Sequence, residues 1–233
     1  MVANPNLAEI TALIGDPSRL AMLLSLLGGK ALPAGDLARF AHVSPQTASA
    51  HLAKMVHAGL LIQEPFGRHK YFRLAGADVA SALEGLLAIA PSRPPRSLRE
   101  SNQAHALQLA RTCYDHLAGR LGVMLTDRLL ETGLLIKTEK DFLLTETGKI
   151  KLQNFGVETE RRPGSRRYFA RQCLDWSERR CHLAGSLGAA LTQRLFELKW
   201  IEYQADGRAV RVTAAGKKGL CDEFGLHCES QYL

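Results

Sequence analysis

The chain has 233 residues, 46% of them hydrophobic, and its formal net charge is +7 with a pI of about 9.3. This length suits two domains with a packed core, and the basic charge favours a polyanionic partner. No run of eighteen apolar residues occurs, and the N-terminus MVANPNLAEI lacks the basic start and apolar stretch of a secretory signal. We therefore expect a cytoplasmic protein without a membrane partner.

The first ninety residues predict five helices and one β-hairpin. The helices are expected at about 6–14, from Pro17 to the Gly28-Gly29 pair, and at about 34–40, 45–57 and 78–89, while the hairpin joins 60–62 to 70–74. Asp16 and Ser44 each precede a proline, which is typical of an N-cap followed by the first helical position. The third and fourth helices, joined by a four-residue turn, predict a helix-turn-helix, and the hairpin predicts a wing.

The fourth helix has an unusual outward face. Ala48, Leu52, Met55 and Val56 recur at helical spacing and are expected to be buried. The other face carries mostly short, uncharged polar side chains, whereas a helix meant only for solvent normally carries long charged ones. Short hydrogen-bonding groups suit a helix that approaches bases and phosphates, and a basic wing tip suits phosphate contacts. The predicted DNA-binding residues are Ser44, Gln46, Thr47, Ser49, Lys54, Arg68 and Lys70.

Three segments in this order, IGDPSRLAMLLSLL, SPQTASAHLAKMVHAGLL and GRHKYFRL, resemble the ArsR/SmtB family of bacterial winged-helix repressors. The resemblance covers about 7–89. It implies a homodimer with the first and fifth helices packed across the two-fold axis, a palindromic double-stranded operator as partner, and no cofactor for DNA binding. His51 also matches the pattern, but we interpret it as a packing residue. The segment ALPAGDLA has no cysteine and the fifth helix has no histidine, so neither of the family's familiar metal sites can form here.

The second half contains an internal repeat behind a linker. The segment PSRPPRSLR at 91–99 is too rich in proline for a helix interior or a central strand, so we predict domains at 1–90 and 100–233. The stretch HLAGRLGVMLTDRLLETGLLI matches HLAGSLGAALTQRLFELKWIE, and LTETGKIKLQNFGV matches VTAAGKKGLCDEFGL, which gives copies at about 116–157 and 182–226. Each copy predicts a long helix, a hairpin and a short helix. The expected fold is mainly α with small β-hairpins (α+β): a winged helix followed by two winged-helix-like repeats.

All five cysteines and both tryptophans lie in this second half, and an odd number of cysteines suits a reducing compartment. The candidate sensing residues are Cys113, His116, Cys173, Asp175, Trp176, Arg179 and His182. Cys113 and His116 are expected to share a helix face, and the equivalent His116 and His182 would approach each other about a pseudo-two-fold axis. Four roles stay open: a metal site, a redox thiol whose pKa is lowered by a neighbouring His or Arg pair, a small-molecule pocket that includes Asp175 and Trp176, and a structural role.

The predicted function is a sequence-specific transcriptional regulator, a homodimeric repressor released by an unknown inducer that the second half senses. The alternative is a thiol- or metal-dependent enzyme, or a protein-interaction module, in the second half with the winged helix as a docking domain. The sequence has no glycine-rich phosphate loop, no G-x-S-x-G elbow and no H-E-x-x-H motif. We therefore assign no catalytic residue and predict that the protein is not an enzyme.

Overall fold

The computed structural model describes residues 6–67, 69–91, 93–161, 164, 167–204 and 207–227, and it divides into two compact units, 1–83 and 84–233. Each unit is described by itself below. Within the described ranges, no helix has the length and apolar character that crossing a membrane requires.

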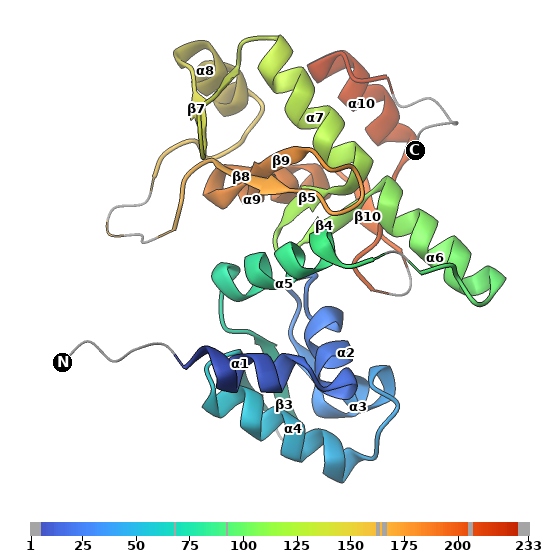
Figure 1. The fold of residues 1–233 in the computed structure, drawn as a ribbon. Coiled ribbons are helices and arrows are strands. Elements are labelled where there is room, and N and C mark those ends of the chain that lie inside the picture. Colours follow the sequence, from blue (N-terminus) through green and yellow to red (C-terminus); the bar gives the residue numbers. More distant parts are fainter. Residues whose placement is uncertain are drawn as a thin grey trace. The chain divides into compact units, whose positions relative to one another are not determined.

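The first unit is a winged helix-turn-helix (Figure 1). Its elements are α1 (Leu7–Ile14), α2 (Pro17–Ser25), β1 (Leu32–Pro33), α3 (Ala34–Phe40), α4 (Pro45–His57), β2 (Leu61–Phe66), β3 (His69–Leu74) and α5 (Ala77–Ile89), which continues into the second unit. The helices and the hairpin lie close to their predicted bounds. The Asp16 side chain accepts a hydrogen bond from Arg19 N and the Ser44 side chain from Thr47 N, which confirms both predicted N-caps.

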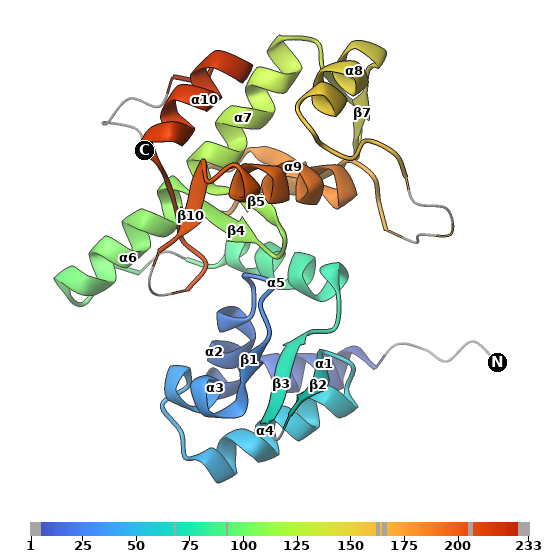
Figure 2. The same ribbon diagram turned by 180° about the vertical axis from the view of Figure 1, so that it is seen from behind.

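The small sheet of the first unit has the order β1-β3-β2 and is antiparallel throughout (Figure 2). Strand β1 was not predicted because it is only two residues long and exists through pairing of Leu32 and Pro33 with Phe72 and Tyr71. Fully buried side chains from α2, α3, α4 and the hairpin fill the interior, among them Leu23, Leu37, Met55 and Leu74.

The second unit begins earlier than the sequence predicts. Helix α6 (Leu98–Leu109) takes the last two residues of the predicted 91–99 linker and was missed altogether. Its start is a capping box, because Glu100 N donates to Ser97 Oγ at 3.1 Å while Arg96 N donates to Glu100 Oε2 at 2.7 Å. The three prolines of the linker end at Pro95, so they do not oppose this helix.

After α6, the same order of elements occurs twice: hairpin, helix, hairpin, helix. The first set is β4 (Arg111–Cys113), β5 (His116–Ala118), α7 (Gly119–Glu131), β6 (Leu135–Lys137), β7 (Phe142–Leu144) and α8 (Glu146–Asn154). The second set is β8 (Arg171–Leu174), β9 (Cys181–Ala184), α9 (Gly185–Glu197), β10 (Ile201–Tyr203), β11 (Val210–Val212) and α10 (Ala214–Phe224). The hairpins β4–β5 and β8–β9 were not predicted, so His116 and His182 lie in strands and do not begin the long helices as the sequence suggested.

The long helix of each set packs on the first hairpin of the other set, an arrangement that we call helix exchange. Helix α7 packs against β9, and α9 packs against β5. Thr126 Oγ1 on α7 accepts from Leu183 N at 2.9 Å, and Thr192 Oγ1 on α9 accepts from Leu117 N at 2.8 Å. Each helix thereby satisfies a buried backbone donor on the hairpin that belongs to the other set.

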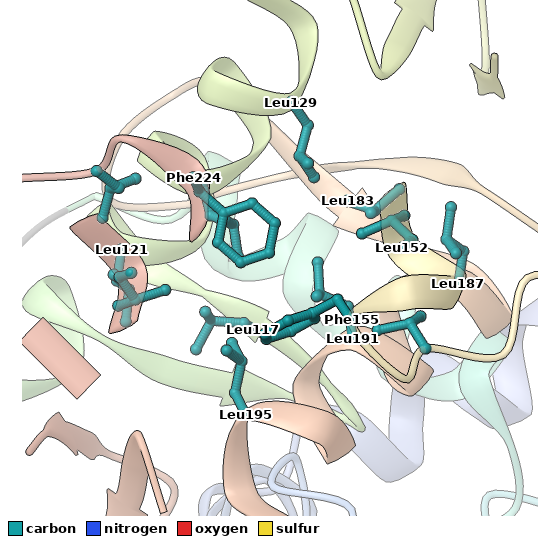
Figure 3. Close-up of a cluster of buried hydrophobic side chains, with 14 of the residues drawn as sticks. Leu117, Leu121, Leu129, Leu152, Phe155, Leu183, Leu187, Leu191, Leu195 and Phe224 are labelled. Carbon is teal, nitrogen blue, oxygen red and sulfur yellow. The ribbon is translucent and has the colours of Figure 1, made fainter. Parts of the chain in front are cut away.

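The core of the second unit is built on the same exchange. Leucines spaced four apart line both long helices, and those of α7 recur in α9 sixty-six residues later. They are Leu121, Leu125 and Leu129 on α7, and Leu187, Leu191 and Leu195 on α9. Figure 3 shows most of them converging with three further side chains. These are Leu152 in α8, Phe155 directly after α8, and Phe224 in α10. Neither long helix could bury this face without the other set.

Candidate functional site

Helix α4 presents the predicted polar face to solvent. Ser44, Gln46, Thr47, Ser49 and Lys54 are all exposed, whereas Ala48, Leu52 and Met55 are buried and Val56 is half-buried. The face also exposes Ala50 and Ala53, so little side-chain bulk stands between the helix backbone and a partner.

Local hydrogen bonds fix the start and the middle of α4. Ser44 Oγ accepts a hydrogen bond from Thr47 N at 3.2 Å and also lies within hydrogen-bonding distance of Thr47 Oγ1, at 2.9 Å. His51 Nδ1 lies 3.2 Å from Arg19 Nη1, and Arg19 Nε donates to Leu13 O at 2.8 Å. His51 therefore joins α4 to α2, in agreement with its interpretation as a packing residue.

The wing tip is basic and aromatic. Gly67 adopts φ 59° at the turn of the hairpin, and Lys70 is exposed, while the predicted Arg68 lies outside the described residues. Phe66 is 73% exposed and packs edge-to-face on Tyr71, with ring centroids 5.8 Å apart. The sequence analysis missed Phe66, although an aromatic residue directly before a glycine-basic turn was a visible signal.

The second unit brings four of the predicted sensing residues together. Cys113 lies opposite His116 across β4–β5, and Cys173 lies opposite His182 across β8–β9. Directly opposite side chains of an antiparallel pair project from the same face. The two pairs meet in the interior, where Cys113 Sγ lies 3.9 Å from Cys173 Sγ and His116 Nε2 lies 3.1 Å from His182 Nε2.

All four ligand atoms of this Cys–His cluster, Cys113, His116, Cys173 and His182, lie within 4.8 Å of one another. Three of the residues are buried and Cys173 is half-buried. The expectation that Cys113 and His116 share a helix face is wrong, because a hairpin and not a helix brings them together. The predicted approach of His116 and His182 does occur.

A carboxylate stands behind each histidine of the cluster. Asp175 Oδ2 lies 3.4 Å from His182 Nδ1, and Asp115 Oδ1 lies 3.5 Å from His116 Nδ1. An arginine from the other set of elements pairs with each carboxylate: Arg111 with Asp175 at 2.8 Å and Arg167 with Asp115 at 2.7 Å. Arg111, Asp115 and Arg167 were not predicted as site residues.

Asp175 is the more deeply held carboxylate, with no exposed side-chain surface. It accepts from Gly119 N at 2.7 Å, Ser177 Oγ at 2.7 Å and Arg111 Nη2 at 2.8 Å. Burial acts to raise the pKa of this carboxyl, but the contact with His182 and the Arg111 charge hold it well below its usual range. In the structure Asp175 is held by these protein partners, which is the structural role among the four left open for it.

Trp176 and Arg179 also have structural surroundings. The guanidinium carbon of Arg111 lies 4.4 Å from the centroid of the Trp176 ring, a cation–π contact. Arg179 donates to the carbonyl oxygen of Ala88, also in the second unit. These contacts lead away from the four ligand atoms of the Cys–His pairs.

The Cys113 thiol is not activated. Its hydrogen bond with Cys173 and its burial raise the pKa to about 12. A reactive thiol needs a lowered pKa and access to solvent, and Cys113 is only 1% exposed. The expectation that neighbouring basic groups lower the pKa of Cys113 is therefore wrong.

Comparisons with known proteins agree with the first unit. Residues 14–64 match the family described as "Helix-turn-helix domain". The chain is 48% identical over 214 residues to the HTH-type transcriptional regulator YdfF of Bacillus subtilis (strain 168), which covers 92% of this chain and 95% of that protein. The match therefore includes the second unit.

Solved structures resemble only part of the chain. The transcriptional repressor BigR from Xylella fastidiosa is 21% identical, with a TM-score of 0.34, over 37% of this chain and 88% of that one. The homodimeric winged helix-turn-helix domain of Mb0332 from Mycobacterium bovis, a possible ArsR-family regulator, is 24% identical, with a TM-score of 0.33, over 38% and 89%.

We expect Asp175→Asn to destabilise the second unit by about 3–5 kcal/mol, because it leaves the buried Arg111 guanidinium without a counter-charge. Urea unfolding followed by tryptophan fluorescence measures this, since both tryptophans lie in the second unit. The control is Asp127→Asn, which breaks a pair with an Arg180 that is 62% exposed and should cost about 0–1 kcal/mol. Equal losses in the two variants would contradict the role given to Asp175.

Proposed function

Because the chain belongs to the family of HTH-type transcriptional regulators that includes YdfF, we propose that it is a homodimeric repressor of the ArsR/SmtB type whose operator binding is released by a signal acting on the second unit. DNA binding and transcriptional regulation follow from the family itself, and its members are regulators and not enzymes. The dimer, the repressor role, the cytoplasmic site of action and the sensing are the proposal.

One observation carries the DNA-reading part of the proposal: α4 exposes only small and polar side chains along its N-terminal half. Gln46 has the amide donor and acceptor that pair with an adenine edge in the major groove, and Thr47 and Ser49 can reach bases or phosphates. Lys54 lies further along the same exposed face and suits a phosphate. The neighbouring alanines let the helix enter the groove without steric obstruction.

Exposed apolar side chains on α1 and α5 support the dimer. Helix α1 has the sequence LAEITALI but buries only Leu13, and Leu7 is 69% exposed. On α5, Leu86 and Ile89 are 45% and 79% exposed and lie three residues apart on one side of the helix. Apolar stripes of this kind are normally covered by a partner, and a two-fold related copy would match a palindromic operator.

The second unit is the proposed signal reader. It follows the winged helix for well over a hundred residues and is shared with YdfF along nearly its whole length. We also propose that 116–157 and 182–226 are an internal duplication, on the strength of the matching sequences and the repeated order of elements. The inducer is sought by titrating metals, oxidants and small molecules onto the complex with the DNA upstream of the gene.

Replacing both Gln46 and Ser49 by alanine should abolish specific operator binding, at a cost of about 1–3 kcal/mol for each lost base contact. Electrophoretic mobility shift or fluorescence anisotropy on the upstream fragment measures the loss, with an unrelated duplex for comparison. Gln153→Ala, at a glutamine on α8 that is also exposed, is the matched control. Wild-type operator affinity in the double variant would refute the assignment of α4.

Lys70→Ala should behave differently, because a wing lysine contacts phosphate. Its affinity for all duplexes should fall alike, and the salt dependence of binding should lose about one unit of slope. Lys218→Ala removes the same charge from an exposed position on α10 and should leave the slope unchanged. A loss confined to the operator sequence would place Lys70 at a base instead.

Leu86→Glu with Ile89→Glu should convert the dimer to a monomer and weaken operator binding, because two charges would enter the apolar interface. Light scattering coupled to gel filtration gives the molar mass. Leu143→Glu with Ile150→Glu is the control, since these side chains are 57% and 52% exposed in the second unit. A monomeric wild type, or a dimer that survives the α5 variant, would contradict the proposed interface.

A further inference from the structure

The interior of the second unit contains a set of four donor atoms that no part of the proposed DNA binding uses. Two sulfurs and two imidazole nitrogens, one of each from β4–β5 and one of each from β8–β9, point at a common centre. We propose that Cys113, His116, Cys173 and His182 bind one divalent metal ion of the zinc class in a closed tetrahedral site that clamps the two hairpins together.

The distances fit that ion. Zinc–sulfur bonds of about 2.3 Å and zinc–nitrogen bonds of about 2.0–2.1 Å place two sulfurs about 3.8 Å apart and two nitrogens about 3.3 Å apart in a tetrahedron. The structure has 3.9 Å between Cys113 Sγ and Cys173 Sγ, and 3.1 Å between His116 Nε2 and His182 Nε2. The largest separation between any two of the four atoms is 4.8 Å.

The surroundings orient both histidines as metal ligands. Each Nε2 faces the centre, while each Nδ1 faces a carboxylate, Asp115 or Asp175, at 3.4–3.5 Å. These are ion-pair distances, and His182 Nδ1 makes no hydrogen bond. When both neutral rings keep their proton on Nδ1, the side that faces the carboxylates, both Nε2 atoms present lone pairs to each other at 3.1 Å. Two lone pairs at this distance repel, and a cation between them removes the repulsion. The carboxylate–histidine arrangement is the one that commonly supports metal-bound histidines.

The donor set also selects the metal and the role. Two thiolates and two imidazoles in a tetrahedron suit Zn²⁺ better than a hard cation such as Mg²⁺ or Ca²⁺, which takes oxygen ligands. Two thiolate charges neutralise a divalent ion, and the flanking Asp115 and Asp175 already have Arg167 and Arg111 as counter-charges. All four positions are filled by protein, so the site has no open position for a substrate.

A Cys113–Cys173 disulfide is the chief rival. It would draw the sulfurs from 3.9 Å to about 2.05 Å and would leave the two imidazoles facing each other without a ligand. The metal accounts for all four residues, whereas the disulfide accounts for two. This site stands independently of the proposed operator binding, so each proposal can fail without the other.

The test is metal analysis of the full chain, purified under reducing conditions without chelator. We expect inductively coupled plasma mass spectrometry to find one Zn²⁺ per chain. After exchange with Co²⁺, we expect the intense visible bands of four-coordinate cobalt together with near-ultraviolet thiolate-to-cobalt charge transfer. Because the spectrum is recorded on the unmodified protein, it tests the site even where a variant fails to fold.

The variant Cys113→Ser with Cys173→Ser should lose the ion and the cobalt bands. The matched control is Cys221→Ser with His227→Ala, which removes a Cys–His contact of 3.5 Å elsewhere in the second unit and should keep both the ion and the bands. Removing the metal with a chelator should lower the midpoint of tryptophan-detected unfolding in the wild type and the control, but not in the cluster variant.

Four results would overturn the proposal: no uptake of Zn²⁺ or Co²⁺ by the reduced protein, the weak bands of six-coordinate cobalt without charge transfer, retention of the ion by the cluster variant, or a Cys113–Cys173 disulfide in freshly isolated protein.

Discussion

The carboxylate of Asp175 is fully buried, and the interior of the second unit depends on how its charge is compensated. A carboxylate without partners would be too costly in an apolar core. Here Arg111 in β4 and Gly119 N at the start of α7 both donate to an aspartate that lies sixty-four and fifty-six residues away along the chain. This requirement fixes the β8–β9 loop against β4 and α7, and it holds the ring of His182 toward the centre.

Helix exchange provides the apolar counterpart of this polar contact. Because α7 lies on β9 and α9 lies on β5, each set of elements leaves its hairpin donors and its leucine stripe unsatisfied until the other set is present. The two sets therefore cannot fold as separate modules, and their hairpins must come face to face. The convergence of His116 and His182 is a direct consequence of this packing, since both lie on the strands that the exchanged helices cover.

Local signals in the sequence were sufficient for the helices and the hairpin of the first unit, whereas strand β1 and the hairpins β4–β5 and β8–β9 depend on pairing that the sequence pattern did not reveal. Two N-caps that are each followed by a proline, together with the Ala48–Leu52–Met55 stripe, predicted α2 and α4, because capping and amphipathicity act within one turn or two. The hairpins β4–β5 and β8–β9 are three or four residues per strand, too short for an alternating pattern. The offset of 66 aligned the histidines but not the cysteines, which are 60 apart, because His182 follows Cys173 by nine positions whereas His116 follows Cys113 by three.

The polar residues discussed above cost the first unit little folding stability but cost the second unit more. Gln46, Ser49 and Lys54 on α4 are exposed to solvent, so their presence costs the fold little. Cys113, His116, His182 and the Arg111–Asp175 pair are buried, where well-packed apolar residues of similar volume would often give equal or greater stability, whereas the Arg167–Asp115 pair is 34% and 32% exposed. The register across both hairpins nevertheless brings a cysteine and a histidine opposite each other twice, despite loops of different length. Packing alone does not require a Cys–His pair in both hairpins, whereas a metal ion bound by all four side chains does.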